Sequence, residues 1–72
     1  MKLHVDKKAD ALDLRLDDSK IVDSEEVSPG VVLDFNDQHR VVGIEMLHLS
    51  TRSASLNLNA LQFETTESEL TG

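Results

Sequence analysis

The fold is decided by the stretch Val31-Val32-Leu33-Asp34-Phe35, followed by Asn36-Asp37-Gln38-His39 and Arg40-Val41-Val42-Gly43-Ile44-Glu45-Met46-Leu47. In both arms an apolar residue returns at every second position, which is the period of a β-strand with one buried face. The polar residues between the arms are typical of a turn. The stretch therefore predicts a β-hairpin.

The length of the loop selects the register of this hairpin. A four-residue loop over 36–39 pairs Leu33 with Val42 and Val31 with Ile44, and it gathers the apolar residues on one face. That face holds Val31, Leu33, Phe35, Val42, Ile44 and Met46. A three-residue loop would instead mix acidic residues into it, so burial favours the four-residue loop. In that loop His39 is expected to take a positive φ.

The chain before the hairpin also reads as strands. A short strand is predicted at 3–5, and Leu12, Leu14 and Leu16 alternate with charged residues in a second strand at 11–16. A third extended segment at 21–27 ends at Ser28-Pro29-Gly30, which breaks a strand ladder. Its acidic residues suit an edge strand, where charge discourages unwanted pairing. These candidate acidic edge residues are Asp23, Glu25 and Glu26.

After Leu47 the alternation stops. Ser50 is a candidate cap for a short helix at 51–55 and Asn57 for a second turn through Ala60, so 50–61 forms either one helix or two turns. A last strand is expected at 62–65. The fold class expected is α+β: a mostly antiparallel sheet of four to five strands, with one short helical segment packed on one face. The single domain spans 1–66, and 67–72 forms an acidic disordered tail.

Charge and composition exclude several classes of function. The 72 residues carry a net charge of −7, and all of it lies in 21–72, where nine acidic residues face two arginines. Nucleic acid binding needs cations against phosphates, so it is excluded. The chain has no cysteine, no long apolar run and no secretory signal pattern, so we expect a soluble, cytoplasmic protein that does not contact membranes.

No constellation of residues points to catalysis. The three histidines, His4, His39 and His48, fall in a strand, a loop and a strand end, and no two of them are spaced to share a site. The three glycines stand alone, so no phosphate-binding loop is present. We therefore expect no enzymatic activity, no catalytic residues, no metal and no cofactor.

The outward face of the hairpin offers a candidate interface. Val32, Val41 and Leu47 surround Gly43 on the side opposite the predicted core. Such residues are ordinary on a wet sheet face, and they also suit self-association or a protein partner. We expect a protein-interaction module that forms a homodimer or binds another, basic, protein.

Three segments of the chain resemble the domain-of-unknown-function family numbered 2283, a family of small bacterial and archaeal proteins. They are 6–16, Gly30-Val31-Val32-Leu33-Asp34-Phe35, and the arm from Arg40 to Leu47. The chain departs from the family at Asp13, where an aromatic residue is common, and at His39, where glycine is usual. The resemblance implies a small α+β domain with no assigned activity. Some relatives resemble the acidic member of a gene pair with a small basic protein, which implies an alternative role as an antitoxin-like neutraliser of a small basic partner.

Overall fold

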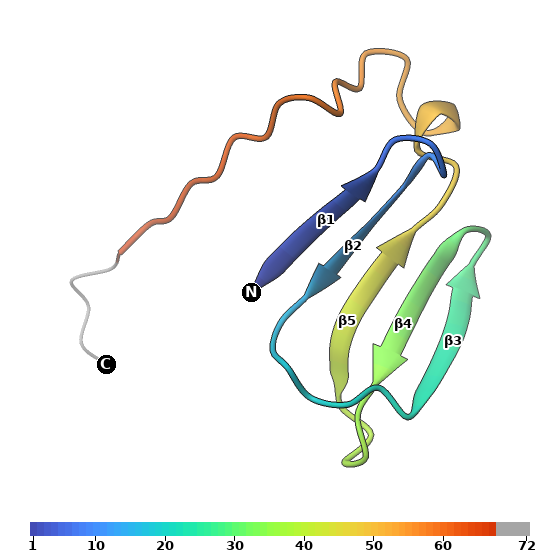
Figure 1. The fold of residues 1–72 in the computed structure, drawn as a ribbon, viewed down its shortest axis with the longest axis vertical. Coiled ribbons are helices and arrows are strands. Elements are labelled where there is room, and N and C mark those ends of the chain that lie inside the picture. Colours follow the sequence, from blue (N-terminus) through green and yellow to red (C-terminus); the bar gives the residue numbers. More distant parts are fainter. Residues whose placement is uncertain (68–72) are drawn as a thin grey trace.

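A computed structural model describes residues 1–67 of the chain. The segment from Lys2 to Met46 forms a single antiparallel sheet of five strands (Figure 1). The strands are β1 (Lys2–Asp6), β2 (Ala11–Arg15), β3 (Asp23–Ser28), β4 (Val31–Phe35) and β5 (Val41–Met46). They lie in the order β1-β2-β5-β4-β3. The connection from β2 to β3 therefore passes the ends of β5 and β4, and β1 and β3 form the two edges.

The hairpin of β4 and β5 is confirmed, but the predicted register is wrong by two residues. Leu33 pairs with Ile44 and Val31 pairs with Met46. The loop holds one residue more than expected, because Phe35 pairs with Val41 and Asn36 N–H donates to Arg40 O at 3.0 Å. A β-bulge opposite Phe35 adds a second residue on β5. Since the total shift is even, the residues of β5 from Gly43 to Met46 stay on their predicted faces. Val41 does not, because it pairs with Phe35.

His39 has φ 59°, so its expected left-handed conformation is confirmed. Its ring stacks on Phe35, with centroids 4.8 Å apart and an interplanar angle of 10°. The stacking contact offsets part of the cost of a non-glycine residue in this region.

The helix expected at 51–55 and the packing of a helical segment on a sheet face are wrong, whereas the turn expected from Asn57 through Ala60 is present, with Ala60 N–H donating to Asn57 O at 3.4 Å. The only helix in the described chain is one 3₁₀ turn, η1 (Leu49–Thr51), and no helix packs on a sheet face. Local side chains take the backbone groups that a helix would need: Ser53 Oγ accepts from Ser55 N–H, and Asn57 Oδ1 accepts from Asn59 N–H. The fold class is therefore mostly β rather than α+β.

The strand expected at 62–65 is also wrong, because this segment has no regular structure and leaves Leu61 and Phe63 about two-thirds exposed. The expected tail at 67–72 lies, apart from Glu67, outside the described residues. Within residues 1–67, no helix reaches the length and apolarity needed to span a membrane.

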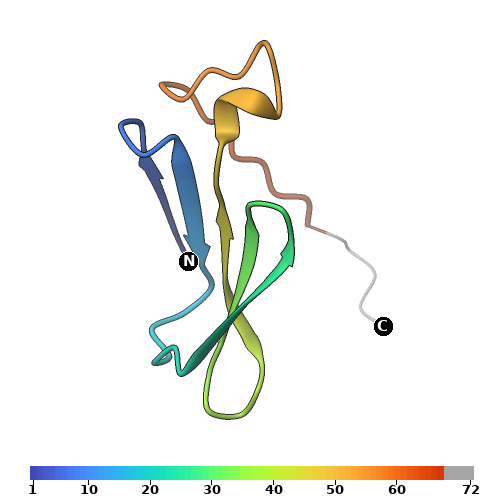
Figure 2. The ribbon, with the colours of Figure 1, turned by 90° about the vertical axis from the view of Figure 1, so that its right-hand side faces the viewer.

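The sheet forms one twisted layer, with no second sheet or helix layer against it in the described chain (Figure 2). Buried apolar side chains are few: Phe35, Val42 and Leu49. Most domains bury a sheet face against a second layer, so this sheet keeps an unusually large share of its faces near solvent.

Candidate functional site

The two faces of the sheet differ sharply in chemistry. Paired residues on adjacent antiparallel strands point to the same side, so the pairing assigns each residue to a face. One face, called here the apolar face, carries Leu3, Val5, Leu12, Leu14, Val31, Leu33, Ile44 and Met46. The opposite, polar face carries Lys2, His4, Asp13, Arg15, Val32, Asp34 and Glu45.

Most of the apolar face remains half-buried. Residues 56–61 lie against one end of it, where they line a hollow of about 200 Å³ together with Leu3, Val5 and Leu12. Towards the middle of the sheet, Leu14, Leu33 and Ile44 keep partly exposed side chains. On β3 the same face ends in acidic residues, since Glu25 pairs with Leu33 and Asp23 pairs with Phe35.

The polar face holds a buried carboxylate. Asp34 is 2% exposed, and Ser24 Oγ donates to its Oδ1 at 2.6 Å. Asp34 fits because β5 has a glycine opposite it: a Cβ on Gly43 would stand 3.0 Å from Asp34 Oδ2 and 3.2 Å from Arg15 Cδ. The Arg15 guanidinium turns away to donate to Ser19 O at 2.6 Å.

Glu45 shares a hydrogen bond with Asp34, and this bond raises the pKa of Glu45 above its ordinary value of 4.5. Partial burial and the charges of Asp34 and Asp13 raise the pKa of Glu45 further. The raised pKa means that Glu45 loses its proton less readily than a free glutamate, because a second negative charge beside Asp34 is unfavourable.

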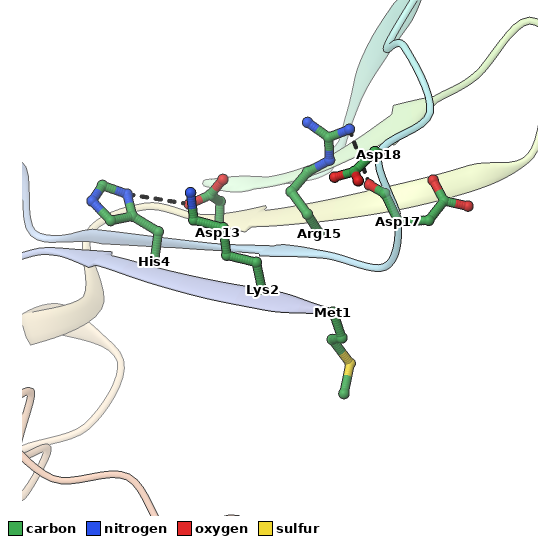
Figure 3. A pocket seen from close by; sticks show the side chains of 7 residues that line it. All are labelled: Met1, Lys2, His4, Asp13, Arg15, Asp17 and Asp18. Atoms are coloured by element: carbon green, nitrogen blue, oxygen red, sulfur yellow. Dashed lines mark hydrogen bonds and ion pairs between the residues drawn. The ribbon is translucent and has the colours of Figure 1, made fainter.

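An open depression of about 490 Å³ lies beside this cluster (Figure 3). Its lining is Met1, Lys2, His4, Asp13, Arg15, Asp17 and Asp18. His4 Nδ1 lies 3.5 Å from Asp13 Oδ1, but both side chains are well exposed, and Met1 and Arg15 point in opposite directions in Figure 3. Within residues 1–67 no three histidine or acidic side chains are grouped so as to hold a metal ion.

The three residues of the predicted interface do not form one patch. Val32 and Leu47 flank Glu45 on the polar side, since Val32 pairs with Glu45 and Leu47 lines a shallow hollow together with Glu45. Val41, the first residue of β5, pairs with Phe35 at the bulge and therefore lies on the side of the apolar face. The predicted acidic residues Asp23, Glu25 and Glu26 are all exposed on the edge strand β3, with Asp23 and Glu25 on the apolar side of the sheet and Glu26 on the polar side.

The sequence reasoning missed both the buried Asp34 and the open state of the apolar face. The signal for Asp34 is the glycine in the middle of β5, because a glycine inside a strand often marks a close approach of another group. The open face has no such signal, since the leucine and valine pattern is the same whether or not a second layer covers it.

The fold and its surfaces define a small single-layer antiparallel β protein with one apolar and one polar face. Comparison with protein families places residues 2–50, which include all five strands, in the family described as "Protein of unknown function (DUF2283)". The match covers more than half of the chain, so the chain belongs to the DUF2283 family, as the resemblance indicated. No curated protein and no solved structure matches the chain.

Proposed function

We propose that this chain is a non-enzymatic protein-interaction module whose apolar face binds a basic protein partner. The observation that carries the proposal is the half-open apolar face of a one-layer sheet, in which Leu14, Leu33 and Ile44 stay partly in solvent. An exposed apolar area with a polar rim is typical of a protein interaction site.

The charged residues at the edge of the apolar face indicate the charge of its partner. Asp23 and Glu25 end the apolar face at β3, and the chain carries a net charge of −7. A partner that places an apolar patch over Leu33 and Ile44 therefore meets acidic side chains at this edge. Lysine or arginine residues at that point of the partner would make favourable charge interactions with them. Such charges mainly speed association and select among partners.

Photocrosslinking in the source cells tests the proposal. A photoreactive amino acid at Leu14 reports on the apolar face, and the same amino acid at Asp13, its neighbour on β2, reports on the polar face. We expect Leu14 adducts with a protein of basic isoelectric point and few adducts at Asp13. Equal labelling at both positions, or Leu14 adducts formed with acidic proteins or only with further copies of this chain, would contradict the proposal.

The antitoxin-like alternative uses the same acidic edge and adds that the partner is harmful when free. The exposure of Asp23, Glu25 and Glu26 on one edge strand favours it. Co-expression separates the two roles: a neutraliser restores growth of cells that make the crosslinked partner alone, and the Glu25→Lys/Glu26→Lys variant loses this rescue. A partner that leaves growth unchanged when expressed alone contradicts the alternative.

A further inference from the structure

The two edge strands of the sheet, β3 and β1, differ in how well they are protected against pairing with another strand. On β3, Ser24 N–H is already occupied, because it donates to Asp23 Oδ1 at 2.9 Å. A bulge between Glu26 and Ser28 and the exposed acidic side chains further disfavour pairing at this edge. The β1 edge has neither an occupied outward amide nor a bulge: Lys2–Asp6 is a regular strand in continuous register with β2, and its one acidic residue, Asp6, stands at the end of the strand.

The free backbone groups of β1 belong to Leu3 and Val5. Leu16 N–H donates to Val42 O at 2.8 Å, so the even-numbered residues of β2 bond to β5. The odd-numbered residues then bond to β1, through its residues Lys2, His4 and Asp6. Leu3 and Val5 consequently turn their N–H and C=O groups outward. Within residues 1–67 no hydrogen bond engages either outward amide.

We propose that two copies of this chain join edge to edge through antiparallel pairing of β1 with β1. The inference rests on the β1 edge and not on the apolar face, so it goes beyond the proposed function. It gives an isologous interface, in which each copy presents the same strand. The two five-stranded sheets become one continuous sheet.

The sequence of β1 is complementary to itself in one register. With His4 opposite His4 of the second copy, Leu3 of each copy pairs with Val5 of the other, and both outward residues find outward partners. A shift of the centre to Leu3 or to Val5 would pair one of them with a residue outside the strand. The His4 register also sets Lys2 opposite Asp6 twice on the polar side, and opposite charges in cross-strand pairs are favourable.

The paired edge leaves the rest of each copy unchanged. The apolar faces of the two copies lie on the same side of the joined sheet, since Leu3 and Val5 share that face. The acidic β3 edges lie at the two outer ends, far from the joint. Residues 56–61 line a hollow with the side chains of Leu3 and Val5, but the segment 53–67 makes no backbone hydrogen bond to β1 in the described chain, so the outward N–H and C=O groups of these two residues remain available to a second copy.

Charge reversal tests the register. Lys2→Asp places two aspartates opposite each other twice, and Asp6→Lys does the same with lysines, so each variant alone should dimerise roughly tenfold to a hundredfold more weakly than the unaltered chain. Mixing the two variants restores complementary pairs and should restore a dimer. Lys8→Asp makes the same change of charge in the β1–β2 turn, outside the pairing, and should dimerise normally. Sedimentation equilibrium measures the unaltered chain, the three variants and the mixture.

Hydrogen exchange gives a second, structural readout. The amides of Leu3 and Val5 should become protected as the concentration of the chain rises. A monomer at every concentration up to the millimolar range overturns the proposal, as does a dimer that none of the charge variants weakens. Protection that is independent of concentration also overturns it, because it assigns the β1 edge to the chain's own segment 61–67.

Discussion

The carboxylate of Asp34 lies over Gly43 on the neighbouring strand, so close that a side chain on Gly43 would place its Cβ 3.0 Å from Asp34 Oδ2. Arg15 Cδ would stand 3.2 Å from the same Cβ, and the hydrogen bond from Ser24 Oγ holds Asp34 in place, so a side chain at position 43 is crowded from both sides. We expect Gly43→Ala to lower the free energy of unfolding by about 1–3 kcal/mol, the usual cost of overpacking. Urea titration measures this. In an Asp34→Ala background the loss should shrink, and an equal loss in both backgrounds would refute the contact.

Glu45 makes the stability of the sheet depend on pH. Its pKa is raised in the folded chain, so the folded state binds more protons than the unfolded state between pH 4.5 and that raised value. The free energy of unfolding therefore falls as pH rises through this interval. Glu45→Gln removes the effect and should be more stable than the unaltered chain at pH 8, with the difference vanishing below pH 4.5. The same change at exposed Glu25 is the control, and a Glu45→Gln variant less stable at pH 8 would contradict the raised pKa of Glu45.

Asp10 ties the β1–β2 turn to η1. Its carboxylate accepts from Ser50 N–H at 3.1 Å and from Ser50 Oγ at 2.7 Å, and its backbone oxygen accepts from Leu49 N–H at 2.9 Å. The hydrogen bonds from Ser50 lower the pKa of Asp10 below 3.8, so this support is present above pH 3.8 and is lost as pH falls further.

We expect Asp10→Ala to speed hydrogen exchange at Leu49 and Ser50 by roughly tenfold at neutral pH, since the turn opens more often. Ser50→Ala should have a smaller effect, because the Ser50 backbone amide remains. The two effects should not add, as the residues share these bonds. Fully additive effects would argue against the direct link.

Arg52 joins the β3–β4 turn to the end of β5. Its Nη2 donates to Pro29 O at 2.7 Å and its Nε donates to Leu47 O at 2.9 Å. Arg52→Ala should cost about 1 kcal/mol of unfolding free energy, with Arg52→Lys between the two because lysine lacks the forked donor. Thermal unfolding measures this against Arg40→Ala, an exposed loop change. A loss no larger than that of Arg40→Ala would show that the link contributes nothing.

The strands could be predicted from the sequence because each leaves a period-two pattern or a break at its end. Leu12 and Leu14 in β2, and Pro29 with Gly30 before β4, are such signals. The predicted register of β4 and β5 is wrong because a bulge opposite Phe35 leaves no signal in the alternation of apolar and polar residues. The predicted helix is wrong because the side chains of Ser53 and Asn57 accept hydrogen bonds from nearby backbone amides and form turns. The same residue types cap helices, so the sequence does not distinguish the two.

The two surfaces predicted from the sequence also differ in how they appear in the structure. The acidic edge followed from charges on one extended segment, and the structure gathers Asp23, Glu25 and Glu26 on β3. The group of Val32, Val41 and Leu47 assumed regular pairing around Gly43, and the bulge sets Val41 apart. The free amides of Leu3 and Val5 depend on the order of strands in space, which alternation within one strand does not contain.

The most direct test of the open apolar face is the relaxation of methyl protons by a soluble paramagnetic chelate in the purified chain. Ile44 and Leu33 lie partly exposed on that face, whereas Val42 is 4% and Leu49 is 3% exposed. We predict strong broadening of the Ile44 and Leu33 methyl signals and little for Val42 and Leu49. If Ile44 and Leu33 are as well shielded as Val42, a second layer covers the sheet and the proposed binding surface does not exist.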